Sequence, residues 1–137
     1  MTPRSLPTAL VALGALIALA VVPLGAHHSF AAEFDGSKPI TLKGVVTQID
    51  WANPHVWFYI NVKDEEGKNV RWACEMGAPH QLQQRGWLRD TMKVGDIVTV
   101  AGSLSRDGAR RANARLVTTA DGKTLGAASS GDPTTRQ

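Results

Sequence analysis

The clearest pattern of hydrophobic and polar positions in the chain begins directly after Asn53-Pro54. One side of the segment from His55 to Val62 would carry Val56, Phe58, Ile60 and Val62, and the other His55, Trp57, Tyr59 and Asn61. A period of two in a segment rich in aromatic and β-branched residues predicts a β-strand with one side in a core. The Asn53-Pro54 pair predicts a break before this strand, because proline has no amide hydrogen to donate to a sheet.

Four more segments have strand-like patterns, namely residues 40–51, 70–76, 97–102 and 112–119. Gly44 in the first of them predicts a bulge or a bend. Residues 63–69 are polar and contain Gly67, which predicts a hairpin loop between the second and third strands. Residues 79–85 predict a short helix that begins at a proline and stops at Gly86.

Three strands, a short helix and two further strands form the element order of the five-stranded Greek-key barrel called the OB-fold. We therefore predict an all-β fold with one short helix, a small five-stranded OB-like barrel over residues 40–125. Its predicted core consists of Val46, Ile49, Val56, Phe58, Ile60, Val70, Trp72, Ile97 and Val98.

The single cysteine, Cys74, lies on the same side of its strand as Trp72 and Met76. One cysteine forms no intramolecular disulfide, and a buried thiol behaves as a small hydrophobic group. We interpret Cys74 as a core residue. The alternative is a copper(I) site made by Cys74 and Met76.

The two ends of the chain differ in composition from the barrel. Arg4 precedes an almost uncharged apolar run, residues 8–22, and small Ala26 suits signal peptidase. Residues 1–26 therefore predict a secretory signal peptide, with a retained N-terminal anchor as the alternative. Cleavage would leave residues 27–39 as an N-terminal segment. Residues 126–137 are small and polar and predict a disordered tail. We expect a soluble periplasmic or secreted protein.

The charge of the chain is nearly balanced, with 15 basic and 12 acidic residues and a formal net charge of +3. The leader contains one basic residue and no acidic one, so its removal would leave a net charge of +2. Such a small excess does not indicate nucleic acid or an anionic membrane as a partner. We expect neither partner for the processed chain.

Two phrases in the sequence resemble a known family. They are His-His-Ser-Phe-Ala-Ala-Glu-Phe-Asp at residues 27–35 and Gly-Val-Val-Thr-x-Ile-Asp-Trp-x-Asn-Pro-His at residues 44–55. Together they resemble an uncharacterised family of small exported bacterial proteins. The resemblance implies that the mature start and the Asn-Pro-His turn recur among members of that family, and it implies no function.

The polar and aromatic side of the second and third strands is the candidate ligand-binding surface. It would carry His55, Trp57, Tyr59, Arg71 and Glu75. A regular hairpin would place Trp57 near Glu75, and Tyr59 near Ala73 or Arg71. The corresponding surface of OB-folds often binds ligands, and aromatic side chains there stack on bases or sugars. We expect an unknown small molecule, sugar, peptide or exported protein as the partner. The alternative is that Phe30 and Phe34 pack on this surface and hide it.

His27 and His28 are candidate metal ligands. Cleavage after Ala26 would give His27 a free α-amine beside its imidazole, and amine and imidazole nitrogens suit copper(II). The alternative is that both histidines are incidental to the cleavage site. His55 could be a third ligand or a turn residue that bonds nearby backbone, and His80 is expected at the surface. No histidine spacing supports a closed zinc site.

The chain contains no catalytic motif such as Gly-x-Ser-x-Gly, and no phosphate-binding glycine loop. Asp50 and Glu75 could lie near each other across the sheet, but two carboxylates without a cleft do not make a hydrolase. We therefore expect a binding protein and not an enzyme.

Overall fold

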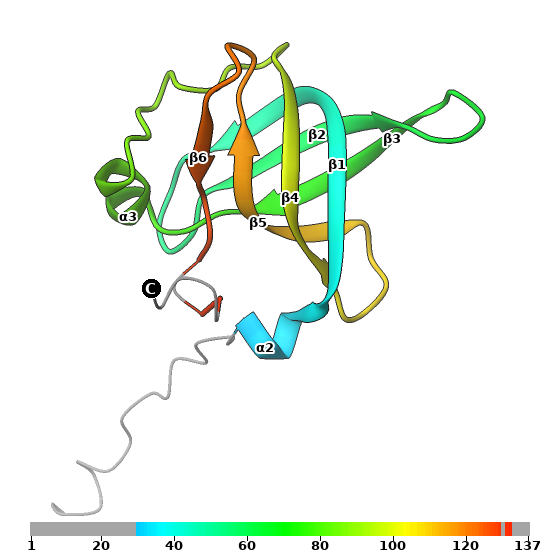
Figure 1. Ribbon diagram of the computed structural model, residues 1–137, viewed down its shortest axis with the longest axis horizontal. Coiled ribbons are helices and arrows are strands. Elements are labelled where there is room, and N and C mark those ends of the chain that lie inside the picture. The colour runs from blue at the N-terminus through cyan, green and yellow to red at the C-terminus, as the bar shows by residue number, and fades with distance from the viewer. Residues whose placement is uncertain (1–29, 130, 133–137) are drawn as a thin grey trace, which may run out of the picture.

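A computed structural model of the chain describes residues 30–129 and 131–132. Its elements are α2 (Phe30–Glu33), β1 (Phe34–Asp50), β2 (Trp57–Lys63), β3 (Asn69–Glu75), α3 (Pro79–Gln84), β4 (Ile97–Ser105), β5 (Arg111–Thr118) and β6 (Thr124–Gly126). The strand order is β3-β2-β1-β4-β5-β6, and an additional pairing of β3 with β5 closes the first five strands into a ring (Figure 1). The β3–β5 pairing is parallel and the other pairings are antiparallel. The predicted all-β, OB-like barrel with one helix between its third and fourth strands is confirmed.

The β2–β3 hairpin extends away from the ring, with a loop at its far end (Figure 1). Asp64 shapes this loop, because one of its carboxylate oxygens accepts hydrogen bonds from the backbone N–H groups of Glu66 and Lys68. Gly67 has a φ of 77°, which is a left-handed conformation that favours glycine. The predicted hairpin loop is therefore present, and it sets the register of β2 and β3.

Strand β1 is longer than predicted, because it begins at Phe34 and runs through the Gly36–Pro39 stretch. A register shift between Asp35 and Pro39 accommodates that stretch. A second shift lies between Val46 and Gln48, next to Gly44 rather than at it. Gly44 instead permits close contact of strands, since a Cβ there would lie 2.5 Å from the carbonyl oxygen of Asn61.

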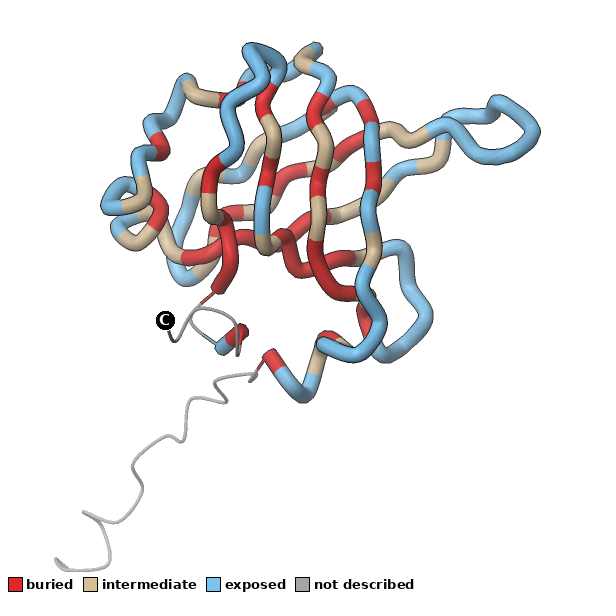
Figure 2. The backbone as a smooth tube through the Cα atoms, in the orientation of Figure 1, coloured by how far each residue is buried: buried red, intermediate tan, exposed pale blue. Residues whose placement is uncertain are grey.

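The core consists of buried residues from every strand of the ring and from the segment that contains α3, and Figure 2 shows where buried residues occur along the backbone. Val46, Val56, Phe58, Ile60 and Val98 are buried as predicted, and Ile49 and Trp72 pack against the core from partly buried positions. Cys74 is also buried, and burial raises the pKa of its thiol to about 12. Val70 is only half-buried, in the part of β3 nearest the hairpin loop.

The prediction that Ile97 is a core residue is wrong. Its side chain is 55% exposed, because the alternation in β4 turns Val98 and Val100 inward and Ile97 outward. Ile97 pairs with Val45 of β1, which is 40% exposed. These two residues form a small apolar patch on the outside of the ring.

The prediction that residues 126–137 form a disordered tail is wrong for residues 126–129. Gly126 belongs to β6, and Ala127, Ala128 and Ser129 are buried. Two side chains hold this segment: the indole Nε1 of Trp87 donates to the carbonyl oxygen of Gly126 at 2.8 Å, and Arg85 donates to that of Ala128 at 2.6 Å. Small residues suit this position because their backbone packs closely against the barrel.

The predicted signal peptide, His27, His28 and the last residues, 133–137, lie outside the described residues. Within the described part of the chain, no helix is long and apolar enough to cross a membrane.

Candidate functional site

The five predicted site residues lie on or beside the outer surface of β2 and β3. Their register is as expected: Trp57 pairs with Glu75, and Tyr59 pairs with Ala73. His55, Trp57 and Tyr59 are half-buried, and Arg71 is exposed. Phe58 and Ile60 alternate with Trp57 and Tyr59 along β2 and face the core. Trp57 and Tyr59 therefore lie on the opposite side of the strand. We call the surface made by His55, Trp57, Tyr59, Arg71 and Glu75 the aromatic face.

A chain of polar contacts crosses one half of the aromatic face. The guanidinium carbon of Arg71 lies 4.3 Å from the ring centroid of Tyr59, a cation–π distance. Arg71 also donates to the side-chain oxygen of Gln48 at 2.9 Å, and the amide nitrogen of Gln48 donates to the carboxylate of Asp50. Arg71 covers one side of the Tyr59 ring. Trp57 is therefore the aromatic side chain of this face that we expect to contact a ligand.

The other half of the aromatic face contains a close pair of ionisable groups. His55 Nδ1 lies 2.5 Å from Glu75 Oε1, with 31% of the His55 side chain and 6% of the Glu75 side chain exposed. Burial, and then the charge of Glu33, raises the pKa of Glu75 to about 7, against an opposing effect of Arg111. Burial lowers the pKa of His55, and Glu33 opposes this. The contact with Glu75 uses the Nδ1 atom of His55, and the imidazole is still partly exposed to solvent.

A cross-strand row continues from the aromatic face into the interior. Asp50 pairs with Trp57, Trp57 with Glu75, and Glu75 with Asn113 of β5. Asp50 is exposed and Trp57 half-buried, whereas Glu75 is 4% exposed and Asn113 is fully buried. We call these four residues the acceptor row. It leads from solvent to a buried end at Asn113, which is bonded to Ser129.

Asn113 is a site residue that the sequence analysis missed. Its Nδ2 donates to Ser129 Oγ at 2.9 Å, while its Oδ1 is buried and has no hydrogen-bond partner among the described residues. A buried polar atom without a partner is rare and calls for an explanation. The one sequence signal was that Asn113 is a polar residue between two alanines. Its place beside Glu75 follows from the β3–β5 pairing.

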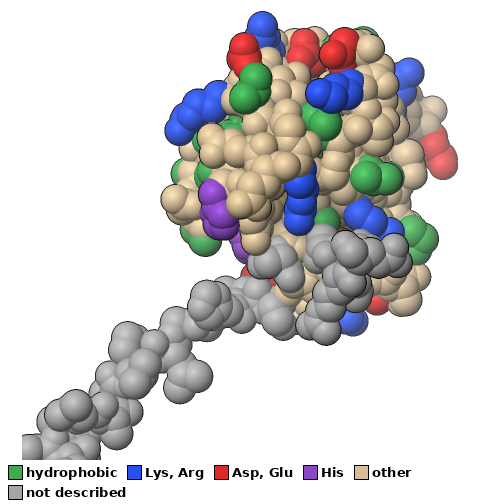
Figure 3. Space-filling view, turned by 60° about the vertical axis from the view of Figure 1, so that its left-hand side comes forward, with side chains coloured by type: hydrophobic (Ala, Val, Ile, Leu, Met, Phe, Trp, Pro, Cys, Tyr) green, Lys and Arg blue, Asp and Glu red, His purple; other side chains and the backbone are tan. Residues whose placement is uncertain are grey.

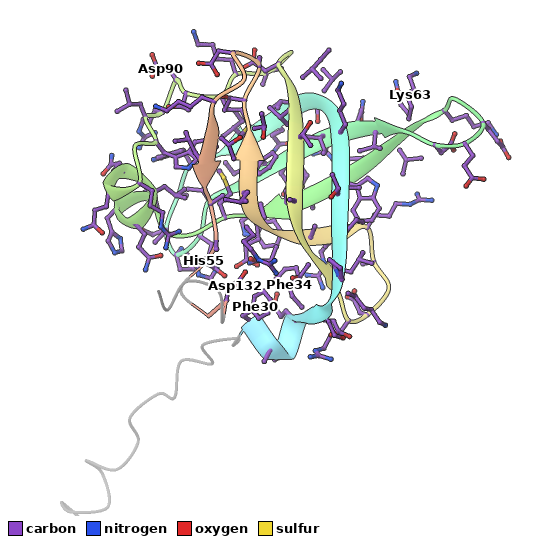
Figure 4. The ribbon with its side chains drawn as sticks, in the orientation of Figure 1. Phe30, Phe34, His55, Lys63, Asp90 and Asp132 are labelled. Atoms are coloured by element: carbon purple, nitrogen blue, oxygen red, sulfur yellow. The ribbon has the colours of Figure 1, made fainter. Side chains whose placement is uncertain are left out.

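Segments from both ends of the described chain cover the inner part of the acceptor row. Phe30 and Phe34 lie at the end of the barrel that also holds His55 and Asp132 (Figure 4). Both rings are buried, and their centroids are 5.8 Å apart. Asp132 is buried and accepts a bond from Arg115 Nε at 3.4 Å. Phe30 and Phe34 therefore pack at the end of the barrel, and Trp57 is partly exposed.

The remaining candidate metal ligands do not gather in the described part of the chain. No group of three or more histidine, cysteine, aspartate or glutamate side chains there could hold a metal ion. Cys74 and Met76 are buried in the core, and His80 is exposed on α3, as expected for a surface residue.

One depression of the described surface lies away from the aromatic face. A shallow depression of about 500 Å³ is lined by Lys43, Gly95, Asp96, Ile97, Thr99, Thr118, Thr119, Ala120 and Gly122, none of which belongs to the aromatic face. Basic and acidic side chains are interspersed on the visible surface in Figure 3, in keeping with the small net charge.

Comparisons with known proteins identify a family but no activity. No curated protein matches the chain. Among solved structures, the chain is similar to one described as the crystal structure of the ZRD-deleted mutant of TiaS in complex with agmatine, at 20% sequence identity and a TM-score of 0.41. The match covers 72% of this chain and 24% of that one, so the chain spans about a quarter of that protein's length. A family described as being of unknown function, DUF6152, matches residues 15–114, and the chain belongs to that family.

Proposed function

We propose that this protein is an exported, soluble, non-catalytic binding module whose ligand contacts the aromatic face. The observation that carries the proposal is the position of Trp57, a large aromatic side chain on the outer surface of the ring, half-buried and separate from the core. Indole rings supply large contact areas at low cost in conformational entropy and are enriched where proteins bind.

The neighbours of Trp57 support a polar ligand. His55 provides a partly exposed imidazole, Asp50 a carboxylate and Arg71 a guanidinium, so the aromatic face and its neighbour Asp50 offer groups that can fix the orientation of a ligand. An apolar contact with a few polar groups around it is typical of binding sites. Nucleic acid is a poor candidate, because the charges on the surface are mixed.

The test compares Trp57→Ala with Ile97→Ser, a substitution at an exposed apolar position outside the aromatic face. Both variants should keep the far-ultraviolet spectrum of the parent. Immobilised parent protein is used to capture sugars, peptides and small molecules from periplasmic extract, and each captured compound is then titrated into the three proteins. We expect Trp57→Ala to weaken binding at least about tenfold, which corresponds to a hot-spot residue, and Ile97→Ser to leave it unchanged. Equal affinity of all three proteins for each ligand would refute the proposal.

The second candidate function is copper(II) binding at a mature N-terminus that begins His27-His28. One observation favours it: Phe30 is buried at the same end of the barrel as His55 (Figure 4). His28 precedes Phe30 by two residues, so their Cα atoms are at most about 7 Å apart. We propose His55 as a third nitrogen ligand of this copper site.

This candidate depends on the cleavage position, so mass spectrometry of the exported protein is the first measurement. Copper(II) titration of the processed chain follows, with a chain that has one extra residue before His27 as the control. The extra residue moves the amine away from the imidazole of His27 and should weaken binding. A mature start at another residue, or equal copper affinity of the two chains, would refute copper binding at this terminus.

A further inference from the structure

Three of the four residues in the acceptor row carry hydrogen-bond acceptors, and the fourth, Trp57, carries an indole. Asp50 and Glu75 provide carboxyl oxygens, and Asn113 provides an amide oxygen that lacks a hydrogen-bond donor among the described residues. Neighbouring strands are about 4.8 Å apart, so one donor group between two neighbouring residues of the row could lie within hydrogen-bond reach of both. A ligand that satisfies the row must therefore donate hydrogen bonds, and one that carries negative charge is disfavoured.

We propose that the acceptor row binds a primary alkylammonium ion, with the charged end between Glu75 and Asn113 and the alkyl part against the indole of Trp57. An ammonium group has three hydrogen-bond donors and no acceptor, which complements these oxygens. The indole ring attracts cations and also contacts alkyl groups. This inference rests on the proposed binding function of the aromatic face and adds the chemical class of the ligand.

The charges around Glu75 are compatible with a bound cation. Arg111 is the nearby cation on β5, and its guanidinium lies 2.7 Å from Asp107 and 3.9 Å from Glu33. Glu33 on α2 adds a negative charge that faces both Glu75 and His55. Arg111 is thus paired with two carboxylates, and Glu75, whose Oε1 contacts His55 Nδ1, adds a third carboxylate to this group.

Because protons compete with the ligand for Glu75, the affinity of the site for an alkylammonium ion should depend on pH. The ammonium ion pairs best with the carboxylate form of Glu75, and burial, followed by the charge of Glu33, raises the pKa of that group to about 7. Below this pH, affinity should fall by up to about tenfold per pH unit, as one proton competes with the ligand. Protonation of His55 acts in the same direction, because it adds a positive charge beside the ligand.

The experiment is a calorimetric titration of the purified protein with n-butylammonium, with n-butanol as the uncharged probe of equal length. We expect n-butylammonium to bind more tightly at about pH 8 than at about pH 6, and n-butanol to bind at least about tenfold more weakly, as expected for a lost charge-assisted interaction. Glu75→Gln should lose affinity and the part of the pH dependence that comes from Glu75, whereas Asp121→Asn, at an exposed carboxylate in the β5–β6 turn, should change neither.

A measurement on the unmodified protein removes any dependence on the folding of Glu75→Gln. Carbon-13 NMR follows the titration of the Glu75 carboxyl, and saturating n-butylammonium should lower its pKa. An unchanged pKa, or equal affinity for n-butanol, would overturn the alkylammonium proposal. If other ligands still require Trp57 while n-butylammonium does not bind, the ligand class is wrong and the binding function stands. If no ligand requires Trp57, both are wrong.

Discussion

Phe58 is the residue at which the strand pattern makes its most direct energetic prediction. Its side chain is fully buried in the core, between the outward-facing Trp57 and Tyr59. Phe58→Ala should lower the free energy of unfolding by about 3–5 kcal/mol, through lost burial and a residual cavity. Urea denaturation checks this, with Ile97→Ala as the control at an exposed position, where the change should be within about 0.5 kcal/mol. Equal effects of the two substitutions would show that the inner and outer sides of the strands have been assigned wrongly.

The His55–Glu75 pair predicts how stability depends on pH. The raised pKa of Glu75 gives a contribution to the free energy of unfolding that is present below about pH 4.5 and is lost as the pH rises to about 7. The lowered pKa of His55 gives a contribution that is present above 6.5 and is lost as the pH falls below that value. Between about pH 4.5 and pH 6.5 the two contributions to stability change in opposite directions with pH. Between pH 6.5 and about 7 the contribution of Glu75 is the one that still changes.

The check is the free energy of unfolding from pH 6.5 to above 7 in the parent protein and in a variant with Glu75→Gln and His55→Asn. The stability of the parent relative to the variant should fall over this range, since the variant lacks both titrating groups. A relative stability that rises with pH would mean that Glu75 is ionised in the folded protein well below pH 7.

At the scale of elements, alternation and turn residues predict those parts of the fold that are determined locally. The pattern from His55 to Val62 correctly separates core from outer positions, and Pro79 and Gly86 correctly bound the short helix, where Gly86 has a φ of 91°. Ile97 was misplaced because a strand-like run of apolar residues does not reveal which side is inner until its partner strand is known.

Contacts between distant segments explain what the sequence could not predict. Asn113 joins the candidate site because β5 pairs in parallel with β3, and nothing near Asn113 in the sequence indicates that pairing. The segment 126–129 lacks hydrophobic periodicity, so its composition predicted disorder, yet it is buried through contacts with Trp87 and Arg85. Such contacts depend on the tertiary arrangement and not on local propensity.

Trp87 tests how β6 is held to the barrel. Trp87→Phe keeps an aromatic ring in the core but removes the Nε1 donor, so the carbonyl oxygen of Gly126 loses its partner. We expect a loss of about 1–3 kcal/mol in the free energy of unfolding and faster hydrogen exchange in β6. Leu88→Ala is the neighbouring control, because Leu88 is 64% exposed. Unchanged exchange in β6 would show that other contacts hold the strand.

At the scale of the whole molecule, the ring of five strands separates stability from recognition. The inside is apolar, while the outside of β2 and β3 carries the aromatic face, and segments from both ends of the described chain cover one end of the acceptor row. Because core and site lie on opposite sides of the same strands, outward substitutions should change binding without unfolding the protein. The claim at the centre of this account is that ligands contact Trp57 on that outer surface.

The indole N–H signals in a proton–nitrogen NMR spectrum test that claim most directly. The chain has four tryptophans, which single Trp→Phe substitutions assign. Trp87 is an internal reference, since its Nε1 is bonded to Gly126 inside the fold. On addition of a captured ligand, we predict that the Trp57 signal shifts in proportion to occupancy while the Trp87 signal stays in place. A ligand that saturates the protein and leaves the Trp57 signal unmoved would contradict the account.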